Sequence, residues 1–222
     1  MLEQLLPNVF WPEIWEASLD TLLMLFGSMV IIVLLGLPLG VLLFLTSPNQ
    51  IFEREKLYNT LSLLVNILRS MPFVILLILM LPVTAFLVGD SLGVKGTIPP
   101  LIVGATPFFA RLVESALREV ERGIIEATQA MGATTWQIIT RALLPEALPG
   151  LLAATTVTAI TLVGYTAMSG LVGGGGLGDL AVRYGYHRYQ LDVMAVTVIL
   201  LLILVQALQM IGDRLVVHFS RK

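Results

Sequence analysis

Few side chains of the types that enzymes use for chemistry occur in this sequence, and their spacing does not bring them together. The chain has no cysteine and only two histidines, His187 and His218, which lie far apart. This excludes thiol catalysis and cysteine metal sites, and we interpret both histidines as interfacial side chains. Gly173, Gly175 and Gly178 match the spacing G-x-G-x-x-G, but no strand precedes them and no βαβ unit is predicted here. We interpret that stretch as a flexible or tightly turned connection.

The G-x-x-x-x-G-K-[ST] pattern of a phosphate-binding loop is also absent from the sequence. We therefore expect no ATP hydrolysis by this chain, and we predict no catalytic residue, metal or cofactor in it. The composition is 57% hydrophobic and 13% charged, with a mean hydropathy of +0.91, whereas soluble domains average about 45–50% and 25%. These values predict an integral membrane protein. The formal net charge of −2 excludes nucleic acid as an expected partner.

One stretch, residues 121–150, is too polar to span a membrane and too regular to be a plain loop. Its first half carries apolar residues at helical spacing, which predicts a helix. These residues are Ile124, Ile125, Ala127, Ala130 and Met131. Gly132 stands where this helix would end, because glycine accepts the left-handed conformation at little cost.

A second, short helix is predicted after this glycine. Thr134 and Gln137 fit a capping box, in which each side chain bonds the other residue's backbone N–H. One side of this helix would carry three apolar residues, Trp136, Ile139 and Leu143. Pro145 and Pro149 are expected to interrupt it before the next apolar run. Such an amphipathic helix either lies on lipid or docks into a groove on a partner, and the pattern alone leaves both open.

The same stretch resembles the cytoplasmic EAA loop of ABC importer permeases, which reads E-A-A, three residues, G, nine residues, I-x-L-P. Thr128 replaces the third alanine of that pattern and Ala142 replaces its isoleucine. In that family the loop forms a coupling helix that sits in a cleft of the ATPase subunit. The resemblance implies this role for Glu126, Ala127, Ala130, Met131, Gly132, Ala133, Thr134, Leu144 and Pro145.

Five apolar runs are long enough to cross a bilayer, which requires about 20 helical residues. Their expected limits are 19–45, 58–88, 98–118, 148–168 and 191–211, and the coupling segment is expected at 121–147. Gly27, Gly36 and Gly40 suit close helix contact in the first run. The second run contains Pro72 and Pro82, so we expect a tilted or kinked helix there. The whole chain, 1–222, is predicted to be one all-α membrane domain.

Two details of the helices are predicted from local pattern. Thr106-Pro107 could cap and restart a helix within the third run. The pair Glu114–Arg118, at a spacing of i, i+4, is interpreted as ordinary surface support. For Arg69 two interpretations stay open, a side chain that snorkels to the headgroups or a structural or pathway charge inside the bundle.

Cations are distributed unevenly over the segments that connect the runs. If the N-terminus is outside, the inner segments hold Arg54, Lys56, Arg111, Arg118, Arg122, Arg141, Arg214, Arg221 and Lys222. The outer segments then hold only Lys95, Arg183 and Arg188. Since cations are enriched on the cytoplasmic side, this predicts an outer N-terminus and a cytoplasmic C-terminus. It also predicts a cytoplasmic coupling segment without using the family resemblance.

Further segments resemble the permease subunit of bacterial methionine ABC importers. They are Arg69–Phe73, Val103–Phe108, Ala130–Thr134, Leu144–Gly150, Leu162–Tyr165 and Gly174–Gly178. The resemblance implies a type I importer permease fold in the bacterial cytoplasmic (inner) membrane. It also implies an assembly of two copies of this chain, two cytoplasmic ATPase subunits that bind ATP and Mg, and an extracytoplasmic methionine-binding protein. Members carry L-methionine and often D-methionine.

Two other functions remain as alternatives at this stage. Permeases for glycine betaine or phosphonate share the loop and a glycine-rich segment after the fourth run. A non-transporting membrane scaffold could also carry an interfacial amphipathic helix, and co-purification with an ATPase would separate it from a transporter.

Five helices enclose little of a pathway, so an identical second chain is expected to supply the other half. Near the outer end of the fourth run, Tyr165, Met168 and Ser169 are candidates for a gate, together with Arg69 as a pathway charge. Methionine is unbranched and adaptable, so a pair of Met168 side chains could seal and reopen a gate. The alternative is that Met168 is simply a packed helix residue.

Overall fold

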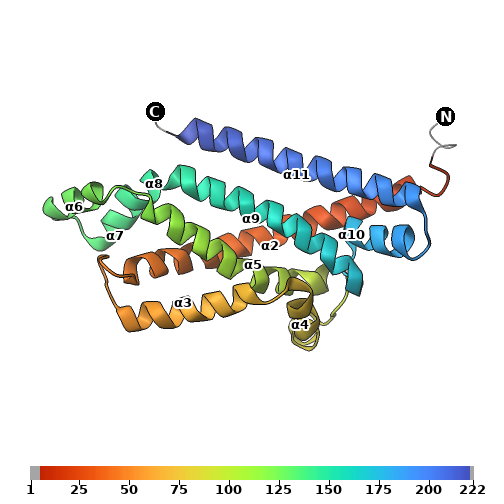
Figure 1. Cartoon of the computed structure of the whole chain (residues 1–222), viewed down its shortest axis with the longest axis horizontal. Helices are drawn as coiled ribbons and strands as arrows, with labels where there is room; N and C mark the ends of the chain where they lie inside the picture. Colours follow the sequence, from red (N-terminus) through yellow and green to blue (C-terminus); the bar gives the residue numbers. More distant parts are fainter. Residues whose placement is uncertain (1–5, 221–222) are drawn as a thin grey trace. The chain divides into compact units, whose positions relative to one another are not determined.

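The structure is a computed structural model that describes residues 6–220 of the 222-residue chain. The predicted cytoplasmic charges Arg221 and Lys222 lie outside the described residues. Helices make up the described part of the chain, which contains no strand, so the all-α prediction is confirmed (Figure 1). The α-helices are α2 (Trp11–Thr46), α3 (Glu55–Ser70), α4 (Phe73–Val88), α5 (Gly93–Arg118), α6 (Arg122–Ala130), α7 (Thr135–Gln137), α8 (Leu144–Glu146), α9 (Leu148–Ser169), α10 (Gly176–Leu180) and α11 (Leu191–Phe219). Two π-helical segments, η1 (Ile138–Leu143) and η3 (Ala181–Tyr186), and one 3₁₀ segment, η2 (Gly170–Val172), complete the series.

Four helices in the described chain are individually long and apolar enough to cross a membrane: α2, α5, α9 with η2, and α11. Helices α3 and α4 meet this criterion only together, which gives up to five candidate spans. The chain leaves the helical conformation at Met71 and Pro72, where we expected one kinked helix over 58–88. Pro72 has no N–H to donate and disfavours the helical conformation at Met71, so the break occurs here.

Helix α5 runs without interruption from Gly93 to Arg118, so the predicted restart at Thr106-Pro107 is wrong. The hydroxyl of Thr106 is buried without a hydrogen-bond partner among the described residues and therefore caps nothing. A proline inside a membrane helix is tolerated where neighbouring segments enclose the backbone that it leaves unbonded.

The chain divides into two compact units, and each long helix contributes residues to both. Unit 1 comprises Met1–Ile31, Met71–Ala105 and Ala159–Gln209. Unit 2 comprises Ile32–Ser70, Thr106–Thr158 and Met210–Lys222.

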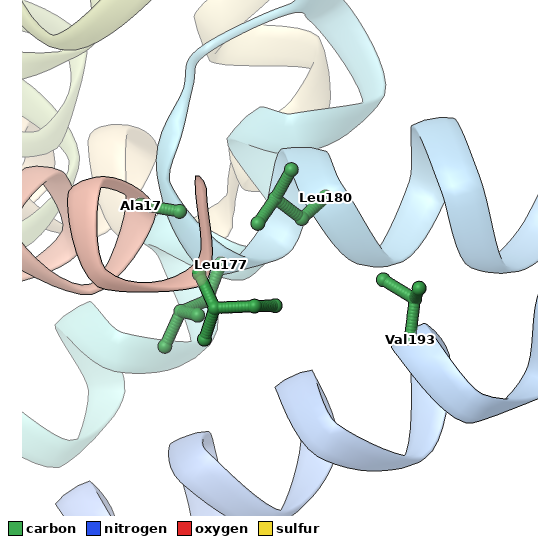
Figure 2. Packing of buried hydrophobic residues seen from close by; sticks show 5 residues of the cluster. Ala17, Leu177, Leu180 and Val193 are labelled. Carbon is green, nitrogen blue, oxygen red and sulfur yellow. The ribbon is translucent and has the colours of Figure 1, made fainter. Parts of the chain in front are cut away.

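In unit 1, a buried apolar cluster joins the start of α2 to α10 and α11. It contains Ile14, Ala17, Leu177, Leu180 and Val193, and the labelled side chains point toward one another in Figure 2. Beside it, the backbone N–H of Leu177 donates to the hydroxyl of Thr21 at 2.9 Å. This contact ties the short helix α10 to α2, because the buried backbone donor finds its partner in another helix.

In unit 2, glycines of α2 allow α2 and α5 to approach closely. A Cβ added to Gly36 would lie 2.7 Å from Cδ1 of Phe109, and one added to Gly40 would lie 2.6 Å from both Ala110 O and Val113 Cβ. Contacts this short leave no room for a side chain, so the expected role of these two glycines in close helix packing is confirmed. Gly27, in unit 1, has only an ordinary contact of 3.6 Å with Ile98.

Candidate functional site

The segment from α6 to α8 in unit 2 carries the residues predicted to couple the chain to a partner. Helix α6 buries Ile125, while most of the predicted coupling residues are exposed. The exposed ones are Glu126, Ala127, Ala130, Met131, Gly132, Thr134 and Pro145, and the partly buried ones are Ala133 and Leu144. The carboxylate of Glu126 pairs with Arg122 one turn earlier at 3.0 Å, with both side chains mostly in solvent. An ion pair in that setting contributes little to stability and leaves the Glu126 carboxylate accessible.

A left-handed glycine ends α6, as predicted. Gly132 has a φ of +77°, and its N–H donates to Gln129 O at 2.9 Å. No atom lies within 4 Å of where its Cβ would be. Glycine is therefore required here by the backbone conformation and not by lack of space.

The predicted capping box after this turn is confirmed. The N–H of Gln137 donates to the hydroxyl of Thr134 at 3.4 Å, and the N–H of Thr134 donates to Oε1 of Gln137 at 2.8 Å. These two bonds satisfy backbone donors that the first turn of a helix would otherwise leave unbonded. Helix α7 therefore begins at a fixed point directly after the Gly132 turn.

Pro145 and Pro149 interrupt the helical path from η1 to α9 less than predicted. A π-helical segment precedes Pro145, in which Leu144 N–H donates to Ile139 O, five residues back. This wider turn accommodates a proline without ending the helical path, and only Ala147 separates α8 from α9. Pro149 lies in the first turn of α9, where its missing N–H costs nothing.

Two large apolar side chains of this segment project into the surroundings. Met131 is 77% exposed and Trp136 is 72% exposed. Both flank the Gly132 turn, so the turn is bordered by apolar surface that a partner or a lipid headgroup layer would cover. The coupling segment thus has a fixed backbone and an exposed apolar border.

A buried ion cluster joins α3 and α5 in unit 2, where the sequence suggested only a surface pair. Glu114 is 3% exposed, and its carboxylate pairs with Arg111 at 2.6 Å and with Arg118 at 2.7 Å. The hydroxyl of Tyr58 donates to the same carboxylate at 3.2 Å. The interpretation of Glu114–Arg118 as ordinary surface support is therefore wrong. The missed signal was periodicity, because Glu114 lies one turn after Ala110, on the buried side of α5.

Arg111 extends this cluster to α3. Its guanidinium donates to the carbonyl of Ser62 at 3.2 Å, to the hydroxyl of Ser62, and to Oδ1 of Asn66 at 3.1 Å. Arg69, one turn after Asn66, stands over the ring of Phe108 with Cζ 5.8 Å from the centroid. This distance fits a cation–π contact, so Arg69 has a protein partner at an exposed position.

The candidate gate segment lies in unit 1, at the end of α9. Tyr165 stacks on Phe73 of α4 with 4.2 Å between the ring centroids and 2° between the planes. Met168 is 46% exposed. Ser169 is fully buried and donates to Thr166 O at 2.7 Å, so Ser169 supports the end of the helix behind Met168.

The glycine-rich connection that follows is tightly packed. Gly173, Gly175 and Gly176 have φ values of +75°, +79° and +76°, which glycine adopts most easily. A Cβ on Gly174 would lie 2.7 Å from both Cβ of Ser169 and Oγ1 of Thr97. Of the two interpretations made from the sequence, the tight turn is confirmed.

The comparisons with known proteins agree with this geometry. The family model for binding-protein-dependent transport system inner membrane components matches residues 36–222. The methionine import system permease protein MetP of Bacillus subtilis is 46% identical over 213 residues, which cover 96% of each chain. The D-methionine transport system permease protein MetI of Escherichia coli is 55% identical over 157 residues, which cover 71% of this chain and 70% of that protein.

A solved structure, of the MetNI methionine ABC transporter in inward-facing conformations, contains a chain with the same fold. The TM-score is 0.93 at 52% sequence identity, and the match covers 94% of this chain and 97% of that chain. The predicted type I importer permease fold is thereby confirmed. Because the family model matches well over half of its residues, the chain belongs to the family of binding-protein-dependent transport system inner membrane components.

Proposed function

We propose that this chain is the transmembrane permease subunit of an ATP-driven importer for methionine. Two copies of the chain enclose the pathway, two cytoplasmic ATPase subunits bind ATP and Mg and hydrolyse the nucleotide, and an extracytoplasmic binding protein delivers the amino acid. The substrate assignment is supported by the relatives, since those of B. subtilis and E. coli are both named for methionine transport. This favours methionine, L or D, over glycine betaine or phosphonate.

The observation that carries the proposal is the fixed, exposed coupling segment between α5 and α9. Its path is set by Gly132 and by the Thr134 capping box, while Met131 and Trp136 remain exposed beside the turn. A rigid segment with an apolar border suits docking into a groove on another protein. In the proposed transporter this segment transmits closure of the ATPase subunits to the membrane helices.

The proposal includes an orientation, with the N-terminus outside and the C-terminus in the cytoplasm. It is supported by the cation distribution, with Arg54 and Arg141 on the proposed inner side and Lys95 and Arg183 on the outer side. All described spans would then form one membrane domain, 1–222, with the coupling segment at 121–147 facing the ATPase.

Replacing Gly132 by valine should abolish transport without preventing membrane insertion. Valine at a φ of +77° costs on the order of 1–3 kcal/mol locally, so the turn moves and α7 is displaced. The measurement is ATP-dependent uptake of labelled methionine into vesicles that contain this chain, its ATPase and its binding protein. Co-purification of the ATPase gives a second readout.

Gly89→Val is the matched control, because Gly89 has a φ of +80° and equally open surroundings but ends α4, outside the coupling segment. It should destabilise the chain by a similar amount and leave ATPase association intact. Equal loss of association in both variants would contradict a special role of the Gly132 turn. Wild-type vesicles that take up glycine betaine or phosphonate but not methionine would overturn the substrate assignment.

For the gate we propose that Met168 from two copies closes the outer end of the pathway, with Tyr165 fixed by its stack on Phe73 and Ser169 supporting the helix end. Met168→Ala should then raise ATP hydrolysis in the absence of binding protein, or let methionine leak from loaded vesicles, because a smaller side chain leaves an opening. Met210→Ala on α11 is the control, since Met210 is 55% exposed and thus comparably accessible. Identical coupling and leakage in both variants would leave Met168 with a packing role alone.

A further inference from the structure

A groove in unit 2 runs between the second half of α2 and the segment that follows the capping box. Its volume is about 420 Å³, which falls in the range of about 300–1,000 Å³ typical of ligand sites. One wall consists of Leu37, Pro38, Val41, Leu42 and Leu45, and the other of Trp136, Ile139, Thr140 and Leu144.

The lining is apolar throughout. Thr140 is the only lining residue with a polar side-chain group other than the indole N–H of Trp136, and its hydroxyl donates to Trp136 O at 2.7 Å. The bond occupies the hydroxyl proton within the helix. Apart from the indole N–H of Trp136, the lining is therefore suited to a hydrocarbon.

The groove continues an exposed apolar part of α2, a helix long and apolar enough to cross a membrane. Leu34 and Leu35, on the turn before it, are 66% and 54% exposed, as expected of side chains that contact lipid. Trp136 at the other wall is a residue type enriched at the membrane–water boundary. If these exposed side chains contact lipid, a hydrocarbon chain would reach the groove along α2.

Two arginines lie beside segments that line the groove. Arg141 directly follows the lining residue Thr140 and is exposed. Arg54 is held near the end of α2, because its N–H donates to Thr46 O at 3.1 Å, one residue beyond the lining residue Leu45. Within the described part of the chain neither guanidinium forms an ion pair. Two cations without an ion pair, each beside a lining residue in the chain or through a backbone bond, complement the phosphate of an anionic lipid.

The groove is short compared with a helix of another protein. A helix with side chains is about 10 Å across and rises about 5.4 Å per turn, so the groove would seat on the order of one turn. We propose that the groove holds an acyl chain of an anionic phospholipid, whose headgroup is bound by Arg54 and Arg141. The bound lipid would fill the space between α2 and the coupling segment.

The test places the complete chain in nanodiscs of phosphatidylcholine that contain a small fraction of phosphatidylglycerol with a photoactivatable group on its acyl chain. After illumination, labelled peptides are identified by mass spectrometry. Labelling should concentrate on residues 37–45 and 136–144, and a phosphatidylcholine probe with the same group should label them far less. Arg54→Gln and Arg141→Gln should each reduce anionic labelling there about fivefold, the factor for one cation near an anionic surface. Arg214→Gln, at an exposed cation on α11, is the control and should leave it unchanged.

A second variant tests the groove itself. Leu42→Trp should fill it and remove labelling of residues 136–144, whereas Leu34→Trp, at an exposed position outside the groove, should preserve that labelling. Equal labelling by the two probes, or unchanged labelling in both arginine variants, would overturn the proposal. If Leu42→Trp does not insert, the arginine variants still decide the outcome.

Discussion

Replacing Glu114 by alanine should lower the free energy of unfolding of the chain by about 3 kcal/mol, because two arginines lose their shared carboxylate. The buried position of Glu114, at 3% exposure, explains the size of this effect. We use the lower end of the range for breaking a buried pair because the Arg118 side chain is 41% exposed and regains some hydration. The measurement is the thermal unfolding transition of the purified chain in detergent, followed by circular dichroism.

Glu126→Ala provides the comparison. Glu126 also pairs with an arginine on its own helix, but its side chain is 62% exposed and that of Arg122 is 70% exposed. The free energy of unfolding of this variant should lie within about 1 kcal/mol of the wild-type value, since exposed pairs contribute little. Similar transitions for both variants would mean that the cluster between α3 and α5 contributes no more than a surface pair. The free energy of unfolding of Glu114→Gln should lie between those of Glu114→Ala and Glu126→Ala, because the amide oxygen still accepts one hydrogen bond.

Gly170→Ala is expected to have the next largest effect, a loss of about 3 kcal/mol in the free energy of unfolding. A Cβ at Gly170 would overlap the backbone of Gly178 and Asp179, and one at Gly178 would overlap the backbone of Ala167. Backbone atoms cannot rotate away as a flexible side chain can. The end of α9 and the helix α10 would therefore have to separate, which exposes apolar surface in unit 1.

Gly164→Ala, in α9 shortly before Gly170, is the matched variant. No atom lies within 4 Å of its added Cβ, so alanine should be neutral or slightly stabilising there. Unfolding transitions in detergent, together with the amount of each variant found in membranes, give the comparison. A Gly170→Ala chain as stable as Gly164→Ala would show that the two segments separate at little cost.

Local features were predicted well where one residue type has few structural options. Gly132 and the Thr134–Gln137 pair identified a turn and a cap because a left-handed φ and a capping box each require particular side chains. The apolar runs identified the spans because a bilayer imposes a minimum length. The prolines of the second run, Pro72 and Pro82, predicted a tilted or kinked helix, but not the complete break between α3 and α4 at Pro72.

The errors arose where a neighbouring helix decides the outcome. Glu114 has the spacing of a surface pair with Arg118, and its burial depends on Tyr58 and on the packing of α3. Thr106-Pro107 has the local pattern of a helix start, but α5 continues through it. Contacts between segments distant in sequence were not available from a single sequence.

The hydrogen bonds that form the Gly132 turn and the Thr134 cap lie within the coupling segment itself. A segment that must fold during docking loses conformational entropy at that moment, at a cost of about 1–2 kcal/mol for each residue that becomes ordered. Here that cost falls in the folding of the permease and not in its assembly. Each later encounter with an ATPase subunit should therefore resemble the docking of two rigid bodies, with an association rate limited by orientation and little slowed by rearrangement of this segment.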